Sequence, residues 1–241
     1  MYRYFIRPIL FLLSPESVHH LLTRFLRVVF IIPGLRRIIS VLYTVNDPRL
    51  ERDFLGLKFK NPVGLAAGFD KNGEVFNEFS AFGFSHIEVG TVTPLGQPGN
   101  PKPRSFRLPK DKALINRMGF NNKGLDALVN RLSEKRASSI LIGGNIGKNT
   151  LTPNEQAVED YLANFKGLYG HVDYFVVNVS CPNISDLHEL QDQDGLERIL
   201  GILSAERKKQ QTYTPILLKV SPDLNEKQID TSIEIVRKYG I

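Results

Sequence analysis

The residues from Tyr174 to Asn183 combine the pattern of a buried strand with side chains that could do chemistry. The first half of this stretch is β-branched and aromatic, which is typical of a strand covered on both faces. The second half is polar and holds the only cysteine of the chain, Cys181. Because Pro182 lacks an N–H and disfavours helical geometry at the residue before it, we expect the strand to end here. A lone thiol is more often structural than reactive, so a buried core cysteine and a nucleophile or base both stay open.

Polar and glycine-rich segments also follow the other predicted strands. The carboxyl ends of parallel strands meet at one edge of a sheet, where α/β proteins carry their chemistry. Glycines let backbone N–H groups approach a flat or anionic ligand, and asparagine amides offer both a donor and an acceptor. One such end would mean little, because Gly and Asn are common in turns, but several together predict a site for a polar heterocycle. The segments are 67–71, 90–93, 143–149, 178–183 and 219–222.

Strand and helix patterns alternate from residue 63 onwards, which predicts parallel β/α units. Five such units are visible, enough for an open doubly wound sheet but not for an eightfold barrel, and periodicity does not choose between these folds. A short hairpin is expected at 57–60 and a Pro- and Gly-rich excursion at 93–107. The predicted strands are 63–67, 87–92, 140–146, 174–179 and 216–220, and the predicted helices are 74–82, 123–135, 154–169, 196–209 and 226–239.

The first 46 residues have their own charge and hydropathy pattern. Ser14, Pro15 and Glu16 are typical of a helix N-cap and first turn, and a second short helix is expected at 35–43. The segment carries six arginines and one acid, a net charge of +5. Its apolar stripe could pack on a core, as in an ordinary surface helix, or lie in a membrane surface. Two apolar segments with arginines on their polar sides favour a helical hairpin on a membrane.

Composition limits the remaining classes of function. The other 195 residues hold 25 basic and 24 acidic side chains, so the body is nearly neutral and no basic stripe indicates a nucleic-acid partner. One cysteine rules out a disulfide framework and fits a reducing compartment. No signal-peptide cleavage site or bilayer-spanning apolar run is visible, and no metal site is predicted.

Several longer motifs stand out when the chain is taken as a whole. They are Asn61 to Lys71, Glu88 to Pro94, Asn116 to Asn121, Asn145 to Asn149, Asn178 to Asn183, and Lys219. Together they resemble the motifs of the dihydroorotate dehydrogenases, the flavin enzymes of pyrimidine synthesis, and specifically their membrane-linked, quinone-using class 2. The resemblance covers essentially the whole chain, and residues 15–19 match the class 2 extension.

The resemblance implies an α/β fold, an eightfold β/α (TIM) barrel, of which about five β/α units are present. It divides the chain into residues 1–46, a helical hairpin for the membrane and the quinone tunnel, and residues 47–241, an FMN-binding β/α barrel incomplete at its carboxyl end. In the family, the later units supply much of the FMN phosphate site. We therefore expect this chain to be a fragment of a longer protein.

The resemblance also implies the reaction and its residues. A base takes the C5 proton of dihydroorotate, a hydride passes from C6 to the flavin, and quinone reoxidises the flavin; Cys181 aligns with the base. A lysine near the flavin ring offers fixed positive charge for the anionic reduced form. The flavin-lining positions are Ala67, Gly68, Phe69, Asp70, Lys71, Thr91, Asn145, Asn178 and Lys219. The substrate positions are Lys71, Asn116, Arg117, Met118, Gly119, Phe120, Asn178 and Asn183, and the polar positions near the quinone tunnel are His19 and Arg107.

At the base, the chain departs from class 2. Members of that class usually carry a serine, with a threonine just after the motif that contributes to a proton relay, whereas this chain has Cys181 and Ile184. A thiol is already partly ionised near neutral pH, so the better base needs less help. Residues 186–188 also differ from the family pattern for the active-site loop.

Two other functions stay open on the sequence. A soluble, class 1-like pyrimidine flavin oxidoreductase using fumarate or NAD shares the turn at 178–183, and an inactive membrane-binding fragment would fit the absent units. The basic hairpin favours the quinone enzyme. The expected partners are dihydroorotate or orotate, a membrane quinone and the membrane surface, with no nucleic acid. We expect a monomer that is peripheral on the cytoplasmic face of a bacterial inner membrane.

Overall fold

Helices fill the amino-terminal part of the chain. The computed structural model describes residues 1–134, 136, 140–180 and 193–241. A π-helix, η1 (Tyr2–Ile6), leads into α1 (Arg7–Phe11), and α2 (Pro15–Val29) and α3 (Leu35–Tyr43) follow. The Ser14 hydroxyl caps α2 by accepting a hydrogen bond from Ser17 N at 3.1 Å. Both helices predicted for this segment are therefore confirmed.

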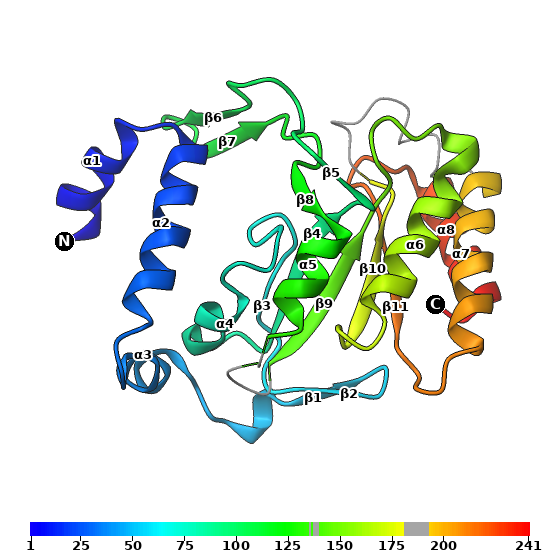
Figure 1. Ribbon diagram of the computed structural model, residues 1–241, viewed down its shortest axis with the longest axis horizontal. Coiled ribbons are helices and arrows are strands. Elements are labelled where there is room, and N and C mark those ends of the chain that lie inside the picture. Colours follow the sequence, from blue (N-terminus) through cyan, green and yellow to red (C-terminus); the bar gives the residue numbers. More distant parts are fainter. Residues whose placement is uncertain (135, 137–139, 181–192) are drawn as a thin grey trace.

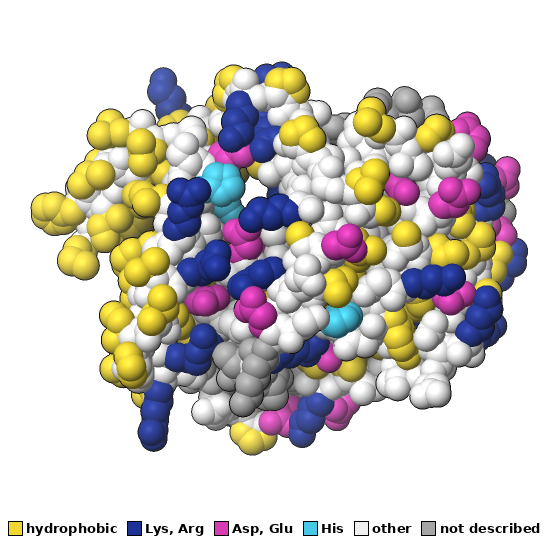
Figure 2. All heavy atoms as spheres, in the orientation of Figure 1, with side chains coloured by type: hydrophobic (Ala, Val, Ile, Leu, Met, Phe, Trp, Pro, Cys, Tyr) yellow, Lys and Arg dark blue, Asp and Glu magenta, His cyan; other side chains and the backbone are white. Residues whose placement is uncertain are grey.

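Much of the apolar side of α2 is exposed, although Leu26 packs against the body of the protein. Leu21, Phe25 and Val28 are 52%, 58% and 65% exposed, while Thr23 and Leu26 are buried toward the body. Apolar side chains of α3 are exposed as well, and Figure 2 shows hydrophobic side chains gathered along the flank formed by α1, α2 and α3. An ordinary surface helix with its stripe on the core does not fit this arrangement. None of the described helices is long and apolar enough to cross a bilayer.

The main sheet decides between the two folds that the sequence left open. Its spatial order is β11-β10-β9-β4-β3, all parallel, so strands that follow one another along the chain are neighbours in space. A doubly wound sheet reverses its order at a switch point, whereas a β/α barrel adds strands in one direction. The order is that of part of a barrel, and within the described residues the sheet is open at β3 and β11. The strands are β3 (Gly64–Leu65), β4 (His86–Val92), β9 (Leu141–Ile146), β10 (Tyr174–Asn178) and β11 (Ile216–Lys219).

Helices cover one face of this sheet, and the hydrophobic core lies between the two layers. Phe175 of β10 packs against Phe165 with ring centroids 4.5 Å apart, whereas its neighbour Tyr174 points to the other face, toward His86 at 6.4 Å. Figure 1 shows α6, α7 and α8 side by side along the sheet. The helical elements are α4 (Phe76–Phe79), η3 (Ser80–Phe82), α5 (Leu125–Leu132), η4 (Asn154–Gln156), α6 (Ala157–Leu168), α7 (Gln193–Lys208) and α8 (Glu226–Tyr239). The five predicted β/α units are thus confirmed, with small shifts in their bounds.

Three pairs of short antiparallel strands lie outside the main sheet in the part of the chain that the structure describes. The hairpin of β1 (Arg52–Phe54) and β2 (Leu57–Phe59) lies near the position predicted. After β4 come four strands that the sequence did not predict, because segments this short show no measurable alternation. In Figure 1, the β6–β7 hairpin extends away from the sheet toward the junction of α1 and α2. The four strands are β5 (Leu95–Gln97), which pairs with β8 (Asn122–Gly124), and β6 (Ser105–Leu108), which pairs with β7 (Ala113–Asn116).

Candidate active site

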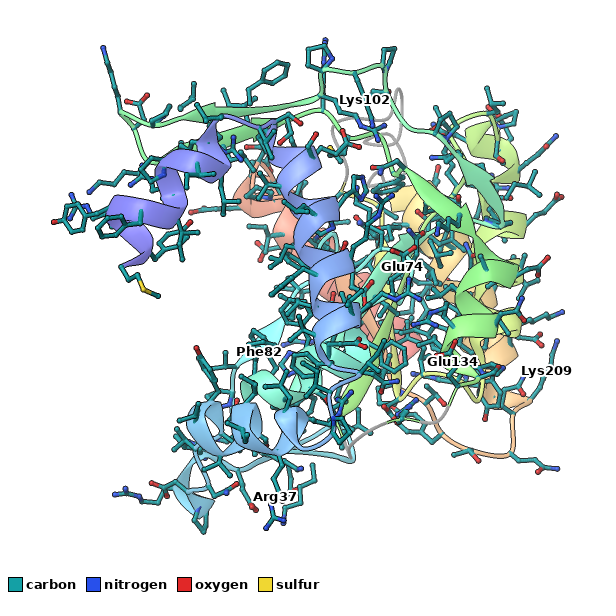
Figure 3. All side chains as sticks on the ribbon, turned by 60° about the vertical axis from the view of Figure 1, so that its left-hand side comes forward. Arg37, Glu74, Phe82, Lys102, Glu134 and Lys209 are labelled. Atoms are coloured by element: carbon teal, nitrogen blue, oxygen red, sulfur yellow. The ribbon has the colours of Figure 1, made fainter. Side chains whose placement is uncertain are left out.

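A cavity of about 740 Å³ lies at the carboxyl ends of the strands, between the sheet and α2. This is the edge at which the sequence predicts a ligand. Figure 3 shows Glu74 beside α2 on the body of the protein, and Lys102 near the upper end of that helix. The lining comes from α2 (Pro15, Glu16, His19, His20, Thr23), from the loop after β3 (residues 65–72) with Glu74, from strand ends (Thr91, Asn178, Ser180, Lys219), and from the β6–β7 region (Ser105, Leu114, Asn116 and residues 118–121).

Three buried polar side chains are bonded to one another beneath the cavity. Thr91 Oγ1 donates to Asn145 Oδ1 at 2.5 Å, and Asn178 Nδ2 donates to Thr91 Oγ1 at 2.9 Å and to Asn145 Oδ1 at 3.3 Å. Ser180 donates to Asn178 Oδ1 through both its backbone N–H and its hydroxyl. Because each amide has a fixed partner, the network holds the side chains in one orientation. Asn145 Nδ2 is buried without a hydrogen-bond partner of normal geometry among the described residues, and it lies near the Glu88 carboxyl group.

The loop after β3 is shaped by a buried carboxyl group. Asp70 is 3% exposed, and its two oxygens accept hydrogen bonds from Glu74 N at 2.6 Å and Val75 N at 2.9 Å. Burial raises the pKa of Asp70 to about 6, although the backbone donors act in the opposite direction. The next residue, Lys71, lines the cavity, and its Nζ donates to Asn121 Oδ1 at 2.5 Å. The loop therefore places the ammonium group of Lys71 at the cavity wall.

A second cation comes from the last strand of the sheet. Lys219 ends β11 directly beside Asn178 of β10 in the strand register, and both line the cavity. Below them, burial raises the pKa of Glu88, and the charge of Lys219 partly offsets this effect. Two lysines and several amides thus surround the polar end of the cavity, a donor set suited to an anionic or strongly polar ring.

The wall formed by Asn116 and residues 118–120 has a tightly constrained backbone. Gly119 and Phe120 have positive φ angles of 70° and 50°. A Cβ atom on Gly119 would lie 2.8 Å from the Asn100 side chain, so the position requires glycine on steric grounds as well. Asn116 and Met118 line the same wall.

The end of the cavity next to α2 is aromatic. The ring of His19 meets that of Phe69 edge-on with centroids 4.7 Å apart, and Phe69 meets Phe79 at 5.1 Å. Burial, with smaller contributions from His20 and Lys71, lowers the pKa of His19, so its imidazole is neutral near pH 7. The cavity therefore offers a polar end for one type of ligand and an aromatic end for another.

Most of the predicted site residues line this one cavity, but some do not. Asn145 supports the floor from below. Arg107 reaches the helices instead, donating to Leu13 O at 2.6 Å, with its guanidinium 4.5 Å from the Phe11 ring centroid. Arg117 points away and donates to Pro103 O at 3.0 Å. Cys181 and Asn183, with Ile184, lie outside the described residues.

The sequence reasoning missed part of the lining on α2. Glu16, His20 and Thr23 join His19 on the cavity side of the helix. Their spacing, with i, i+3, i+4 and i+7 positions all polar, is that of one helical face, so the signal was present in the sequence. Glu16 was interpreted only as an acid that favours the helix dipole. Asn121, Ser105 and Leu114 also line the cavity without having been predicted as site residues, and Ser180 lines it within the predicted segment 178–183.

The sheet order and a cavity at the carboxyl ends of its strands define the class of protein, that of the β/α-barrel enzymes. The family model described as dihydroorotate dehydrogenase matches residues 49–241, and the chain belongs to this family. Membership implies a flavin cofactor. The lysines, asparagine amides and glycine-rich loop of the polar end fit such a group.

Relatives and solved structures agree with this assignment. A dihydroorotate dehydrogenase (quinone) of Christiangramia forsetii is 53% identical over 241 residues, which are 100% of this chain and 70% of the relative. One of a Roseiflexus species is 48% identical, covering 98% of this chain and 65% of the relative. A crystal structure of DHODH from Eimeria tenella in complex with ferulenol superposes with a TM-score of 0.82 at 36% identity, covering 95% of this chain and 65% of that one. The chain thus spans about two thirds of the length of the proteins it matches.

Proposed function

We propose that this chain belongs to an enzyme that oxidises dihydroorotate to orotate, with FMN as the hydride acceptor and a membrane quinone as the final electron acceptor. The observation that carries the proposal is the two-ended cavity: a polar end with Lys71, Asn178 and Lys219, and an aromatic end with His19 and Phe69. The relatives named as quinone-dependent dihydroorotate dehydrogenases support it.

At the polar end, the substrate's carboxylate would face the ammonium group of Lys71, which Asn121 already orients. The ring edge of the substrate presents N–H and C=O groups, which match the donor and acceptor of the Asn178 amide. Asn116 and residues 118–120 would close the site from the opposite wall, and Asn183 would add a second amide. FMN, when bound, would supply the hydride-accepting centre, held by residues 67–71, Thr91, Asn145, Asn178 and Lys219.

The protein's own part in the chemistry is to remove a proton and to orient the reacting carbon atoms. We assign the removal of the C5 proton to Cys181, which follows directly on Ser180 at the floor of the cavity. Lys219 would supply fixed positive charge next to the flavin ring, whose reduced form is anionic. The Thr91, Asn145 and Asn178 network would hold the amides so that little reorganisation is needed during the reaction.

The amino-terminal helices would deliver the electron acceptor. Their exposed apolar faces and net charge of +5 suit an amphipathic anchor on an anionic membrane surface. Residues 1–46 would then form the membrane and quinone unit and residues 47–241 the catalytic unit, with His19 and Arg107 near the quinone path. We place the enzyme, as a monomer, on the cytoplasmic face of the bacterial inner membrane.

The experiment compares two electron acceptors. The protein reconstituted with FMN is given dihydroorotate, and orotate formation is followed with a long-chain quinone in vesicles and with a small soluble dye. We expect turnover with both. When residues 1–46 are deleted, we expect loss of the quinone reaction, with the dye reaction retained at saturating dihydroorotate. Formation of orotate with NAD or fumarate but not with quinone would instead favour a class 1-like enzyme. No orotate with any acceptor, from protein that holds FMN stoichiometrically, would contradict the proposal.

A further inference from the structure

A buried ion pair joins α2 to the loop between β5 and β6. Arg104 is 5% exposed, and the side chain of its partner Glu16 is 10% exposed. The guanidinium donates to both carboxylate oxygens of Glu16, from Nη2 to Oε1 at 2.6 Å and from Nε to Oε2 at 3.2 Å. This two-point geometry fixes the angle between the planar groups as well as their distance. Lys102 approaches the same carboxylate at 3.4 Å, but its side chain is 65% exposed.

The remaining donors of Arg104 hold its own loop in shape. Nη1 donates to Pro98 O at 2.5 Å and to Asn100 O at 3.0 Å. Among the described residues, the hydrogen bonds of the guanidinium therefore go to Glu16 and to the loop backbone. Because the charge is buried, loss of Glu16 would leave an uncompensated cation inside the protein, and the loop would have to rearrange to reach water.

That loop in turn supports the wall of the cavity from behind. Asn100 N donates to Met118 O at 3.1 Å, and Arg117 N donates to Arg104 O at 2.9 Å. Gly119 passes so close to Asn100 that no side chain fits between them. Met118 and Gly119 line the cavity, whereas Arg104 does not. Glu16 lines the cavity from the other side, on α2.

We infer that Glu16 and Arg104 are positioning residues that connect the seating of helix α2 to the shape of the substrate-facing wall at residues 116–120. The two sides of the cavity are linked through one ion pair and two backbone hydrogen bonds. The helices that face the membrane are thus coupled to the end of the cavity that binds the polar ligand. The part of this inference that concerns substrate rests on the proposed function; the part that concerns the wall does not.

The test measures amide hydrogen exchange at Asn100 and Arg117, whose N–H groups report on the wall directly. Glu16→Gln removes the charge at constant shape, and Arg104→Lys keeps the charge but loses the two-point geometry. Lys102→Ala is the matched control, since it removes an exposed cation next to Glu16 and leaves Arg104 with its hydrogen bonds to the loop backbone in place. We expect exchange at both amides to become about tenfold faster in the first two variants, a typical coupling between sites, and to stay unchanged in the control. Glu16→Asp, which keeps the charge, should restore part of the protection.

The second measurement is dihydroorotate oxidation with a soluble dye, which bypasses quinone. In Arg104→Lys we expect the KM for dihydroorotate to rise about tenfold while kcat changes far less, because Arg104 acts only through the wall. Exchange as slow in both variants as in the parent would overturn the inference. Faster exchange with an unchanged KM would overturn its extension to substrate. A parent protein without dihydroorotate oxidation would instead refute the proposed function, and the exchange result would still decide the link.

Discussion

Asn178 Nδ2 lies 2.9 Å from Thr91 Oγ1, a hydrogen bond that joins β10 to β4 across the intervening strand β9. The two residues are 87 positions apart in the chain. Asn145 of β9 accepts from both, so the ends of three strands are tied by one polar cluster in the floor of the cavity. A floor built in this way resists displacement, because moving any one strand would leave buried polar atoms without partners.

Thr91→Val tests this cluster at nearly constant shape. The variant leaves Asn178 Nδ2 with one weaker partner and removes the donor to Asn145, so the free energy of unfolding should fall by about 1–3 kcal/mol. Orotate should also bind more weakly, because the amide of Asn178 is no longer held. Chemical denaturation and a ligand titration measure both effects. Thr212→Val, at an exposed position, is the control and should change neither; equal behaviour of the two variants would contradict the role given to the cluster.

The exposed face of α2 should decide membrane binding. Phe25 and Val28 are 58% and 65% exposed and lie beside arginines, so replacing both with glutamate removes apolar area and adds repulsion from anionic lipid. Co-sedimentation with anionic vesicles should fall about tenfold or more, while dye reduction is preserved. Ile233→Glu, at a 42% exposed position of α8, is the control for adding an acid elsewhere. Unchanged sedimentation of the double variant would rule out α2 as the anchor.

Glu16 should make stability depend on pH in the acid range. The hydrogen bond from Arg104 holds the pKa of Glu16 at about 2, below its ordinary value of 4.5. A lowered pKa in the folded state means that the contribution to stability is complete above pH 4.5 and is lost as the pH falls toward 2. The parent should therefore lose its stability advantage over Glu16→Gln between these pH values. If the difference in the free energy of unfolding between parent and variant stayed constant across that pH range, the ion pair would not contribute to stability.

Much of the architecture was accessible from the sequence, because long periodic segments carry their own signal. Strand patterns such as 140–146 and helix patterns such as 226–239 were predicted within one residue of β9 (Leu141–Ile146) and α8 (Glu226–Tyr239). The choice between a doubly wound sheet and a barrel was not accessible from periodicity, since both repeat the same β/α unit. It depends on which strands are neighbours, and the order β11-β10-β9-β4-β3 supplies that information.

The candidate site was predicted better on the sheet than beyond it. Thr91, Asn178 and Lys219 are each at the end of a strand, so the fold alone brings them to one edge. Arg107 and Arg117 are on or next to β6 and β7, and which way a residue on such a short hairpin points depends on a register that the sequence does not reveal. The partnership of Glu16 with Arg104 spans 88 positions and has no local pattern, so it emerges only from the packed structure.

Cys181 and Ile184 lie outside the described residues, and their roles are predictions from the sequence. If Cys181 removes the C5 proton as a thiolate, flavin reduction by dihydroorotate should rise with pH through the pKa of the thiol and then level off. Cys181→Ala should lose the chemical step by several orders of magnitude yet still bind orotate, since Asn178 and Lys71 remain in place.

Cys181→Ser is the sharper variant. A serine hydroxyl is a poor base that needs a relay, and Ile184 cannot provide one, so this variant should be severely impaired. Adding Ile184→Thr supplies a hydroxyl next to the motif and should recover part of the loss, whereas Ile184→Thr alone should gain little, because the thiol needs no relay. The two substitutions are then non-additive. Rapid-mixing measurements of flavin bleaching in the parent and the three variants give the coupling directly, and a serine variant as fast as the parent would show that the two positions act independently.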